Sequence, residues 1–135
     1  MANRRMFSKE ITNTDSFQSM KLSSQALYFH LGMNADDDGF VGNPLSITKA
    51  IEASSKDLER LVENGFLLPF RGGVYLITDW LINNHIRRDR YSPTVHQEFK
   101  RMVGLDENGR YALGIPPDIP VVDPDKDSIG QDSTV

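Results

Sequence analysis

The chain contains no cysteine among its 135 residues. A disulfide scaffold, a thiol nucleophile and a cysteine-based zinc site are therefore excluded. The N-terminal ten residues include no apolar stretch of the kind that a signal peptide requires, and apolar runs such as residues 66–68 and 74–77 are far too short to span a bilayer. These absences predict a soluble cytoplasmic protein with no membrane association.

Basic residues are scarce in the last quarter of the chain. The net charge is −4, but residues 104–135 carry two basic against seven acidic side chains, a net charge of −5, and the first 103 residues carry +1. Phosphate attraction requires local positive charge. The overall acidity therefore does not exclude nucleic-acid binding by residues 1–103.

Composition also predicts the domain boundary. The length favours one domain. Residues 104–135 contain four prolines, many aspartates and no helical or strand period, which predicts a disordered acidic tail. Two alternatives to a disordered tail remain. The acidic segment could bind a partner, or the apolar stretch 115–122 could dock on the domain. Residues 1–103 are predicted to form the folded domain, with an N-terminal lead-in and a C-terminal extension.

Periodicity and capping residues predict the elements of that domain. Apolar spacing, serine caps, Pro44 and glycine-bearing turns supply the signals. The predicted elements are a helix from about Ser23, a short strand at 40–41, a helix from 43–44, a helix at 55–64, a hairpin with strands at 66–70 and 74–79, and a short helix within 94–102.

Two helices joined by a tight turn and followed by a hairpin form a winged helix-turn-helix. The predicted fold class is therefore mainly α with a small β-hairpin (α+β), followed by the acidic tail.

Patterns that favour catalysis are lacking. Residues 39–44 contain glycine but not the ending of a phosphate-binding loop. The sequence Asp36-Asp37-Asp38 lacks the alternating ligands and distal glutamate of a calcium loop, and is predicted to be a solvated turn. The three histidines are scattered and are interpreted as structural. We therefore expect no enzyme activity, no cofactor and no metal.

A basic segment follows the hairpin and has three arginines in four residues. Arginine offers paired donors to phosphate or guanine, and asparagine can contact adenine or phosphate. A solvated surface and a subunit interface are the alternatives. The predicted DNA contacts in this segment are Asn83, Asn84, Arg87, Arg88, Arg90 and Tyr91.

The predicted recognition helix, residues 55–64, is less basic. With its leucines turned inward, its outer face shows two bases, Lys56 and Arg60, against the acids Asp57, Glu59 and Glu63. Such a face predicts weak binding per subunit, because acids repel phosphates. Further contacts are predicted at Lys49, at Arg71 in the hairpin turn, and at the N-terminal Arg4, Arg5 and Lys9.

Two stretches also resemble a known family. Residues 22–44, LSSQALYFHLGMNADDDGFVGNP, resemble the start of the replisome organiser (replication initiator) proteins of phages and prophages of low-GC Gram-positive bacteria. Residues 80–94, WLINNHIRRDRYSPT, resemble the second signature of that family, INN-x-I-[RK]-[RK]-DRY-x-PT. The resemblance covers about residues 4 to 103.

The resemblance implies an N-terminal winged-helix domain related to DnaD-type primosomal proteins, which bind double-stranded origin DNA and tend to self-associate. In longer members a C-terminal region recruits a helicase or helicase loader; this chain departs from them after residue 103. We therefore expect a phage-type replication protein acting in the bacterial cytoplasm. The alternatives are a scaffold for oligomerisation or partner docking that does not read DNA, and a winged-helix transcriptional regulator.

Overall fold

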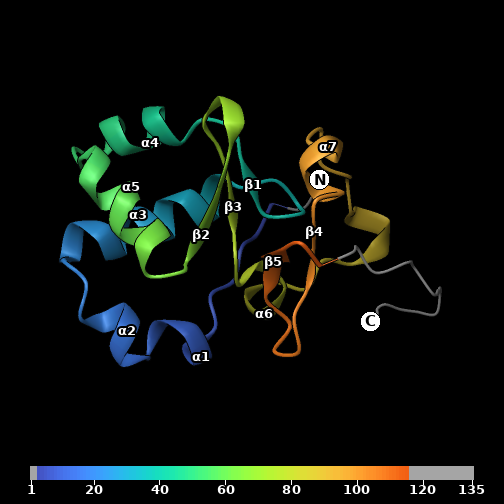
Figure 1. Cartoon of the computed structure of the whole chain (residues 1–135), viewed down its shortest axis with the longest axis horizontal. Coiled ribbons are helices and arrows are strands. Elements are labelled where there is room, and N and C mark those ends of the chain that lie inside the picture. The colour runs from blue at the N-terminus through green and yellow to red at the C-terminus, as the bar shows by residue number, and fades with distance from the viewer. Residues whose placement is uncertain (1–2, 116–135) are drawn as a thin grey trace.

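A small antiparallel sheet lies at the centre of a mixed α and β structure, as the computed structural model of residues 3–115 shows (Figure 1). Within this range, no helix is long and apolar enough to cross a membrane. The helices are α1 (Lys9–Thr12), α2 (Asp15–Gln18), α3 (Leu22–Asn34), α4 (Pro44–Ala50), α5 (Ser55–Glu63), α6 (Trp80–Asn83) and α7 (Gln97–Lys100). The strands are β1 (Phe40–Val41), β2 (Leu67–Phe70), β3 (Val74–Ile77), β4 (Val103–Leu105) and β5 (Tyr111–Leu113).

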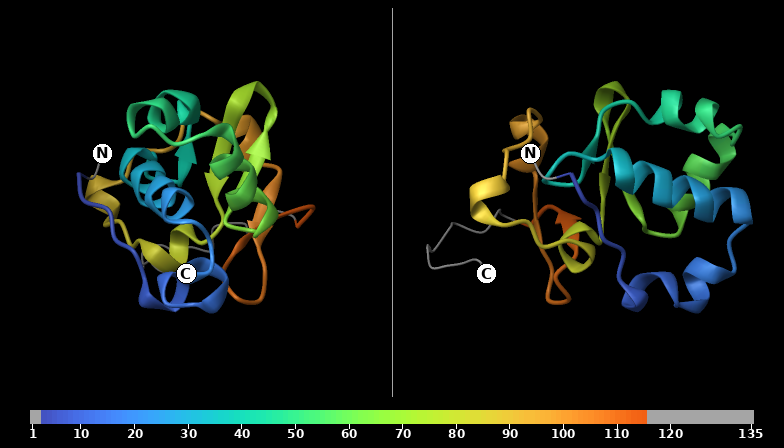
Figure 2. Two further views of the ribbon diagram at one scale, coloured as in Figure 1. Left: turned by 90° about the vertical axis from the view of Figure 1, so that its left-hand side faces the viewer. Right: turned by 180° about the vertical axis from the view of Figure 1, so that it is seen from behind.

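The three-stranded sheet has the order β1-β3-β2, and both of its strand pairs are antiparallel. Residues 71–73 connect β2 to β3, and Gly72 and Gly73 both adopt positive φ there, which explains why the chain has glycine at this turn. Helices α3, α4 and α5 lie on one side of the sheet, and α7 with the β4–β5 hairpin lies on the other (Figures 1 and 2).

The predicted elements from residue 22 to residue 77 are confirmed as helices and strands. Pro44 occupies the first turn of α4 as predicted. The Ser54 side chain and the Asp57 side chain form a capping box at the start of α5, and Gly65 follows α5 with a φ of +82°. The predicted helix within residues 94–102 is reduced to the single turn of α7, between Pro93 and β4.

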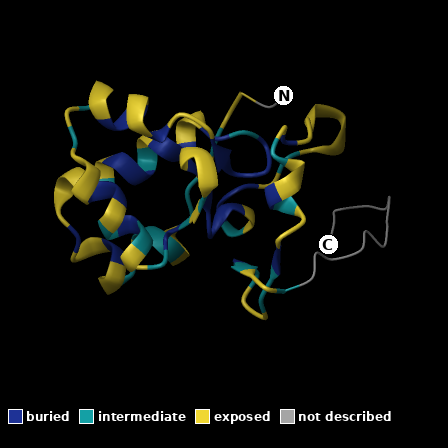
Figure 3. Cartoon of the chain, turned by 45° about the horizontal axis from the view of Figure 1, so that its top comes forward, coloured by how far each residue is buried: buried dark blue, intermediate teal, exposed yellow. Residues whose placement is uncertain are grey.

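The core combines aliphatic side chains with a cluster of aromatic rings contributed by α2, α3 and the segment before β2. Phe17, Tyr28 and Phe66 pack edge to face, with ring centroids 5.2–5.8 Å apart. Gly32 on α3 lets Phe7 of the N-terminal segment pack against the helix, because a Cβ there would lie 2.6 Å from the Phe7 ring. Exposed residues lie along the outer surfaces of the helices, whereas buried residues fill the centre (Figure 3).

Residues 104–115 differ from the prediction of a disordered tail. They complete the β4–β5 hairpin, in which Tyr111 is buried and its amide donates to the Thr78 carbonyl at 2.9 Å. Strands of three residues are too short to show the alternation of apolar and polar residues that is typical of a strand, and the turn between them is polar. The hairpin therefore could not be predicted from the composition of this stretch. Residues 116–135, which hold the rest of the predicted tail, lie outside the described residues.

Gly39 provides a test of the packing between β1 and α6. It has a φ of +97°, and a Cβ there would lie 2.6 Å from the Trp80 ring. We expect Gly39→Ala to lower the free energy of unfolding by about 3 kcal/mol, because backbone strain and overpacking add. The matched control is Gly72→Ala, where φ is +77° and the space is open. This control should lose only about 1 kcal/mol in urea unfolding; equal losses would contradict the packing argument.

Candidate nucleic-acid interface

The arginine segment, residues 87–90, is exposed and contains a 3₁₀ turn at Arg88–Arg90. Its three arginine side chains face solvent, and Arg87 Nε lies 3.3 Å from the carboxylate of its neighbour Asp89. Asp89 is the only acid among these four residues, so the segment keeps a net positive charge. Exposed guanidinium groups at this density suit phosphate oxygens.

Buried hydrogen bonds fix the chain just before the arginine segment. The Oδ1 atom of Asn83 accepts from the Ser8 amide at 2.9 Å, and its Nδ2 donates to the Tyr28 hydroxyl at 2.8 Å. The Oδ1 atom of Asn84 accepts from the Met6 amide at 2.7 Å. Both asparagines are only 5% exposed, so their side chains bind the N-terminal segment and present no surface to DNA.

The chain just after the arginine segment is fixed by the acidic turn, Asp36–Asp38. The Tyr91 hydroxyl donates to the Asp38 carboxylate at 2.8 Å, and the amides of Ser92 and Thr94 donate to Asp37 and Asp38 at 2.9 and 2.8 Å. Burial and the neighbouring Asp38 carboxylate raise the pKa of Tyr91. Tyr91 thus anchors the segment, and its hydroxyl is not free for a phosphate.

The acidic turn is not the solvated turn that the sequence predicted. Asp37 and Asp38 are 3% and 5% exposed. Arg5 donates to Asp37 at 3.1 Å and to the Ala35 carbonyl at 2.7 Å, and Lys100 Nζ donates to Asp38 at 2.9 Å. The prediction was wrong because these partners come from distant parts of the chain, and no local pattern shows them.

The same contacts remove Arg5 from the predicted DNA-binding residues. Its side chain is 2% exposed and its guanidinium lies 5.3 Å from the centre of the Trp80 ring. Arg4 and Lys9, in contrast, are exposed.

Helix α5 presents a narrower charged face than predicted. Asp57 is buried, not outward: it accepts from the Ser23 and Ser24 hydroxyls of α3 at 2.8 and 2.7 Å, and from the Ser54 amide at 2.9 Å. Arg60 donates to Asp57 at 3.1 Å and to Ser24 at 3.2 Å, so it links α5 to α3.

Three charged side chains of α5 are left exposed on its outer face: Lys56, Glu59 and Glu63. Lys49, in the last turn of α4, is also exposed. Arg71, at the tip of the β2–β3 hairpin, pairs with Glu98 of α7, and its guanidinium lies 5.8 Å from the centre of the Phe99 ring.

These basic groups do not form one surface. Helix α5 lies toward one end of the long axis of the molecule, and the arginine segment lies toward the other, with the sheet between them (Figures 1 and 2). Lys49 and Lys56 therefore belong to a different face from Arg87, Arg88 and Arg90.

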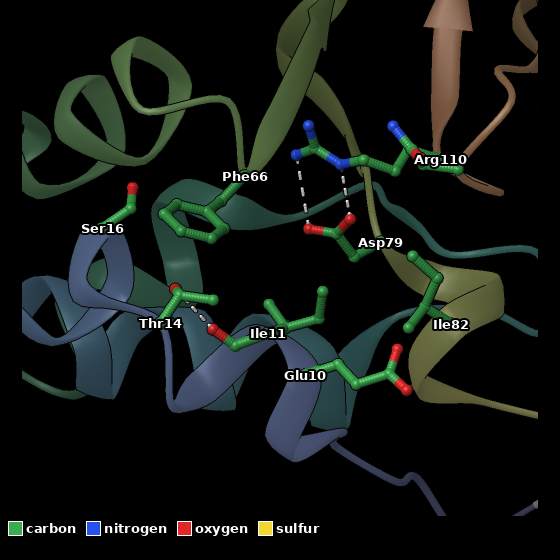
Figure 4. A pocket seen from close by; sticks show the side chains of 9 residues that line it. Glu10, Ile11, Thr14, Ser16, Phe66, Asp79, Ile82 and Arg110 are labelled. Atoms are coloured by element: carbon green, nitrogen blue, oxygen red, sulfur yellow. Dashed lines mark hydrogen bonds and ion pairs between the residues drawn. The ribbon is translucent and has the colours of Figure 1, made fainter.

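A cavity of about 440 Å³ opens between α1, α2 and the β4–β5 turn (Figure 4). The carboxylate of Asp79 lies on its wall and accepts from Arg110 Nε at 2.7 Å. Phe66, Ile11 and Ile82 supply apolar walls. The Thr14 hydroxyl donates to the Ile11 carbonyl at 2.8 Å, so this side chain serves the local turn.

Within residues 3–115, no group of three or more histidine, aspartate or glutamate side chains is placed to hold a metal ion. Comparison of the chain with protein-family models, with curated proteins and with solved structures gives no match.

The buried carboxylate of Asp57 should make stability depend on pH. Burial alone raises its pKa, but hydrogen bonds from Ser54, Ser24 and Ser23, together with Arg60, lower the pKa from 3.8 to about 2. A depressed pKa stabilises the fold above about pH 5, and this contribution is lost as pH falls through 2. Between pH 5 and pH 2, we expect wild type to lose about 2 kcal/mol more than Asp57→Asn in urea unfolding. Parallel pH profiles would contradict this assignment.

Asp38→Asn tests the acidic turn. It leaves Lys100 without its carboxylate and weakens the acceptor for Tyr91, so we expect a loss of about 3 kcal/mol in the free energy of unfolding. Asp89→Asn is the matched control, because the Asp89 side chain is 64% exposed. An exposed pair contributes little, and the control should change stability by less than about 1 kcal/mol. Similar losses in both variants would show that the turn does not anchor residues 91–100.

Proposed function

We propose that this chain is a DNA-binding replication protein of the phage replisome-organiser type, in which residues 1–103 form a winged-helix domain and residues 22–77 supply its helix-turn-helix and wing. The observation that carries the proposal is the order α3, β1, α4, α5, β2, β3 with the sheet order β1-β3-β2. Helices α4 and α5 correspond to the helix-turn-helix, α5 to the recognition helix, and the β2–β3 hairpin to the wing.

The resemblance of residues 22–44 and 80–94 to replisome organisers supports replication over transcriptional regulation. Residues from both stretches make contacts with each other: the Asp36–Asp38 turn belongs to the first, and Tyr91, Ser92 and Thr94 belong to the second. The two stretches of resemblance therefore meet in one structural unit, in which the proposed role is to bind double-stranded origin DNA and help assemble the replication machinery.

Two surfaces support DNA contact in this proposal. One is the exposed face of α5 with Lys56, together with Lys49 and Arg71. The other is the arginine segment, whose backbone is anchored by Asn84 on one side and Tyr91 on the other. Anchoring fixes the backbone path from which the three arginine side chains extend, so that less backbone conformational entropy is lost when phosphates bind. Self-association and recruitment of a helicase or helicase loader belong to the same proposal.

An electrophoretic shift with origin-like duplex tests it. We expect binding at about 50 mM salt that weakens as salt rises, because counterions are released on binding. The Arg87→Ala, Arg88→Ala, Arg90→Ala triple variant should bind more weakly and lower the slope of log K against log salt by about 2–3, since each phosphate contact contributes about 0.9.

The matched control replaces the same three arginines by lysine. This variant keeps the positive charge, so most of the wild-type slope of log K against log salt should remain. Absence of duplex binding by the wild-type chain at low salt would refute the proposal. It would favour the alternative of an oligomerisation or docking scaffold, which light scattering over a range of concentrations would detect.

A further inference from the structure

The outward stripe of α5 contains two acids and one base. Lys56, Glu59 and Glu63 follow the spacing i, i+3, i+7 of one helix face, opposite the buried side chains of Leu58 and Leu61. All three are exposed, and none of them forms an ion pair with any residue in the described part of the chain. This stripe is therefore what α5 offers to a partner.

The acids on this stripe need an explanation if α5 enters the major groove. The Arg60 guanidinium donates hydrogen bonds to Asp57 and Ser24. Its positive charge therefore does not offset the negative charge of Glu59 and Glu63 on the outer face of α5. A carboxylate surrounded by phosphates is repelled, and it loses hydration as the groove closes over it. Such a carboxylate is compatible with a position inside the groove only where a base edge donates a hydrogen bond to it. Glu63 is the last residue of α5, about 6 Å beyond Glu59 along the helix axis, so it stays outside a groove that only the N-terminal half of α5 enters.

The chemistry of the base edges restricts which base that is. In the major groove, cytosine presents the N4 amino donor, whereas adenine presents its N6 donor next to the N7 acceptor, which repels a carboxylate. Guanine, the partner of cytosine, presents the acceptors O6 and N7, which suit an ammonium group such as that of Lys56. Residues three apart in a helix are about 4.5 Å apart along its axis. This distance is close to the rise of roughly 3.4 Å between successive base pairs.

We propose that Glu59 determines the base specificity of this protein by accepting a hydrogen bond from the N4 amino group of a cytosine, while Lys56 donates to a guanine in an adjacent base pair. The sequence preferred by the chain thus contains a G·C-rich step under the N-terminal half of α5. This inference rests on the proposed function, because it requires α5 to lie in the major groove of duplex DNA.

Selection from a library of randomised duplexes tests the inference with the full chain as wild type, as Glu59→Gln and as Glu107→Gln. We expect wild type to enrich a cytosine at one position and Glu59→Gln to enrich adenine there, since a carboxamide pairs with the N6 and N7 atoms of adenine. The affinity of Glu59→Gln for the wild-type site should fall about 10-fold. Glu59 is exposed, so the variant should unfold at the same temperature as wild type.

Glu107→Gln controls for the loss of one negative charge. Glu107 is exposed on the turn between β4 and β5 and is not part of α5, and its variant should keep the cytosine preference. Retention of cytosine by Glu59→Gln would overturn the assignment to Glu59. Duplex binding with no base preference in wild type would overturn it too, while leaving the proposed function standing. Absence of any duplex binding would instead refute the proposed function itself.

Discussion

The pairing of the buried acidic turn is the constraint on which the rest of the structure depends. Burying two carboxylates that are less than one-tenth exposed is costly in a protein unless cations and hydrogen-bond donors surround them. Here those donors come from Arg5, from Tyr91 to Thr94 and from Lys100. The Trp80 indole also donates to the Asp37 carbonyl at 2.9 Å. One turn thus ties the N-terminal segment, α6 and the C-terminal extension to the helices and sheet.

This constraint also shapes the arginine segment. The segment lies between two anchored stretches, so its charged side chains extend from a backbone whose path is already determined. The anchors are polar residues that the sequence alone suggests as DNA contacts, namely Asn83, Asn84 and Tyr91. In the folded chain they hold the segment in place, whereas Arg87, Arg88 and Arg90 are exposed at the surface.

Elements with strong local signals were predictable from the sequence. The Gly72-Gly73 turn, Pro44 and the Ser54 cap each act through backbone geometry within a few residues, and the helices and strands around them were predicted correctly. Contacts across 53 to 78 residues of sequence were not predictable, and they decide the burial of Asp38 and of Asn84. The inward side chain of Asp57 was missed although a capping box is a local signal, because its contacts with α3 are distant ones.

The acidic turn has a further consequence for how the chain folds during synthesis. Asp38 precedes its partners Tyr91 and Lys100 by 53 and 62 residues, so a nascent chain that has emerged only through the β2–β3 hairpin contains the turn but not these donors. Contacts that are so distant along the chain require loop closure before they stabilise anything, which slows folding. Helices α1 to α5 and the three-stranded sheet can form early, but the turn can be enclosed only after residue 100 leaves the ribosome.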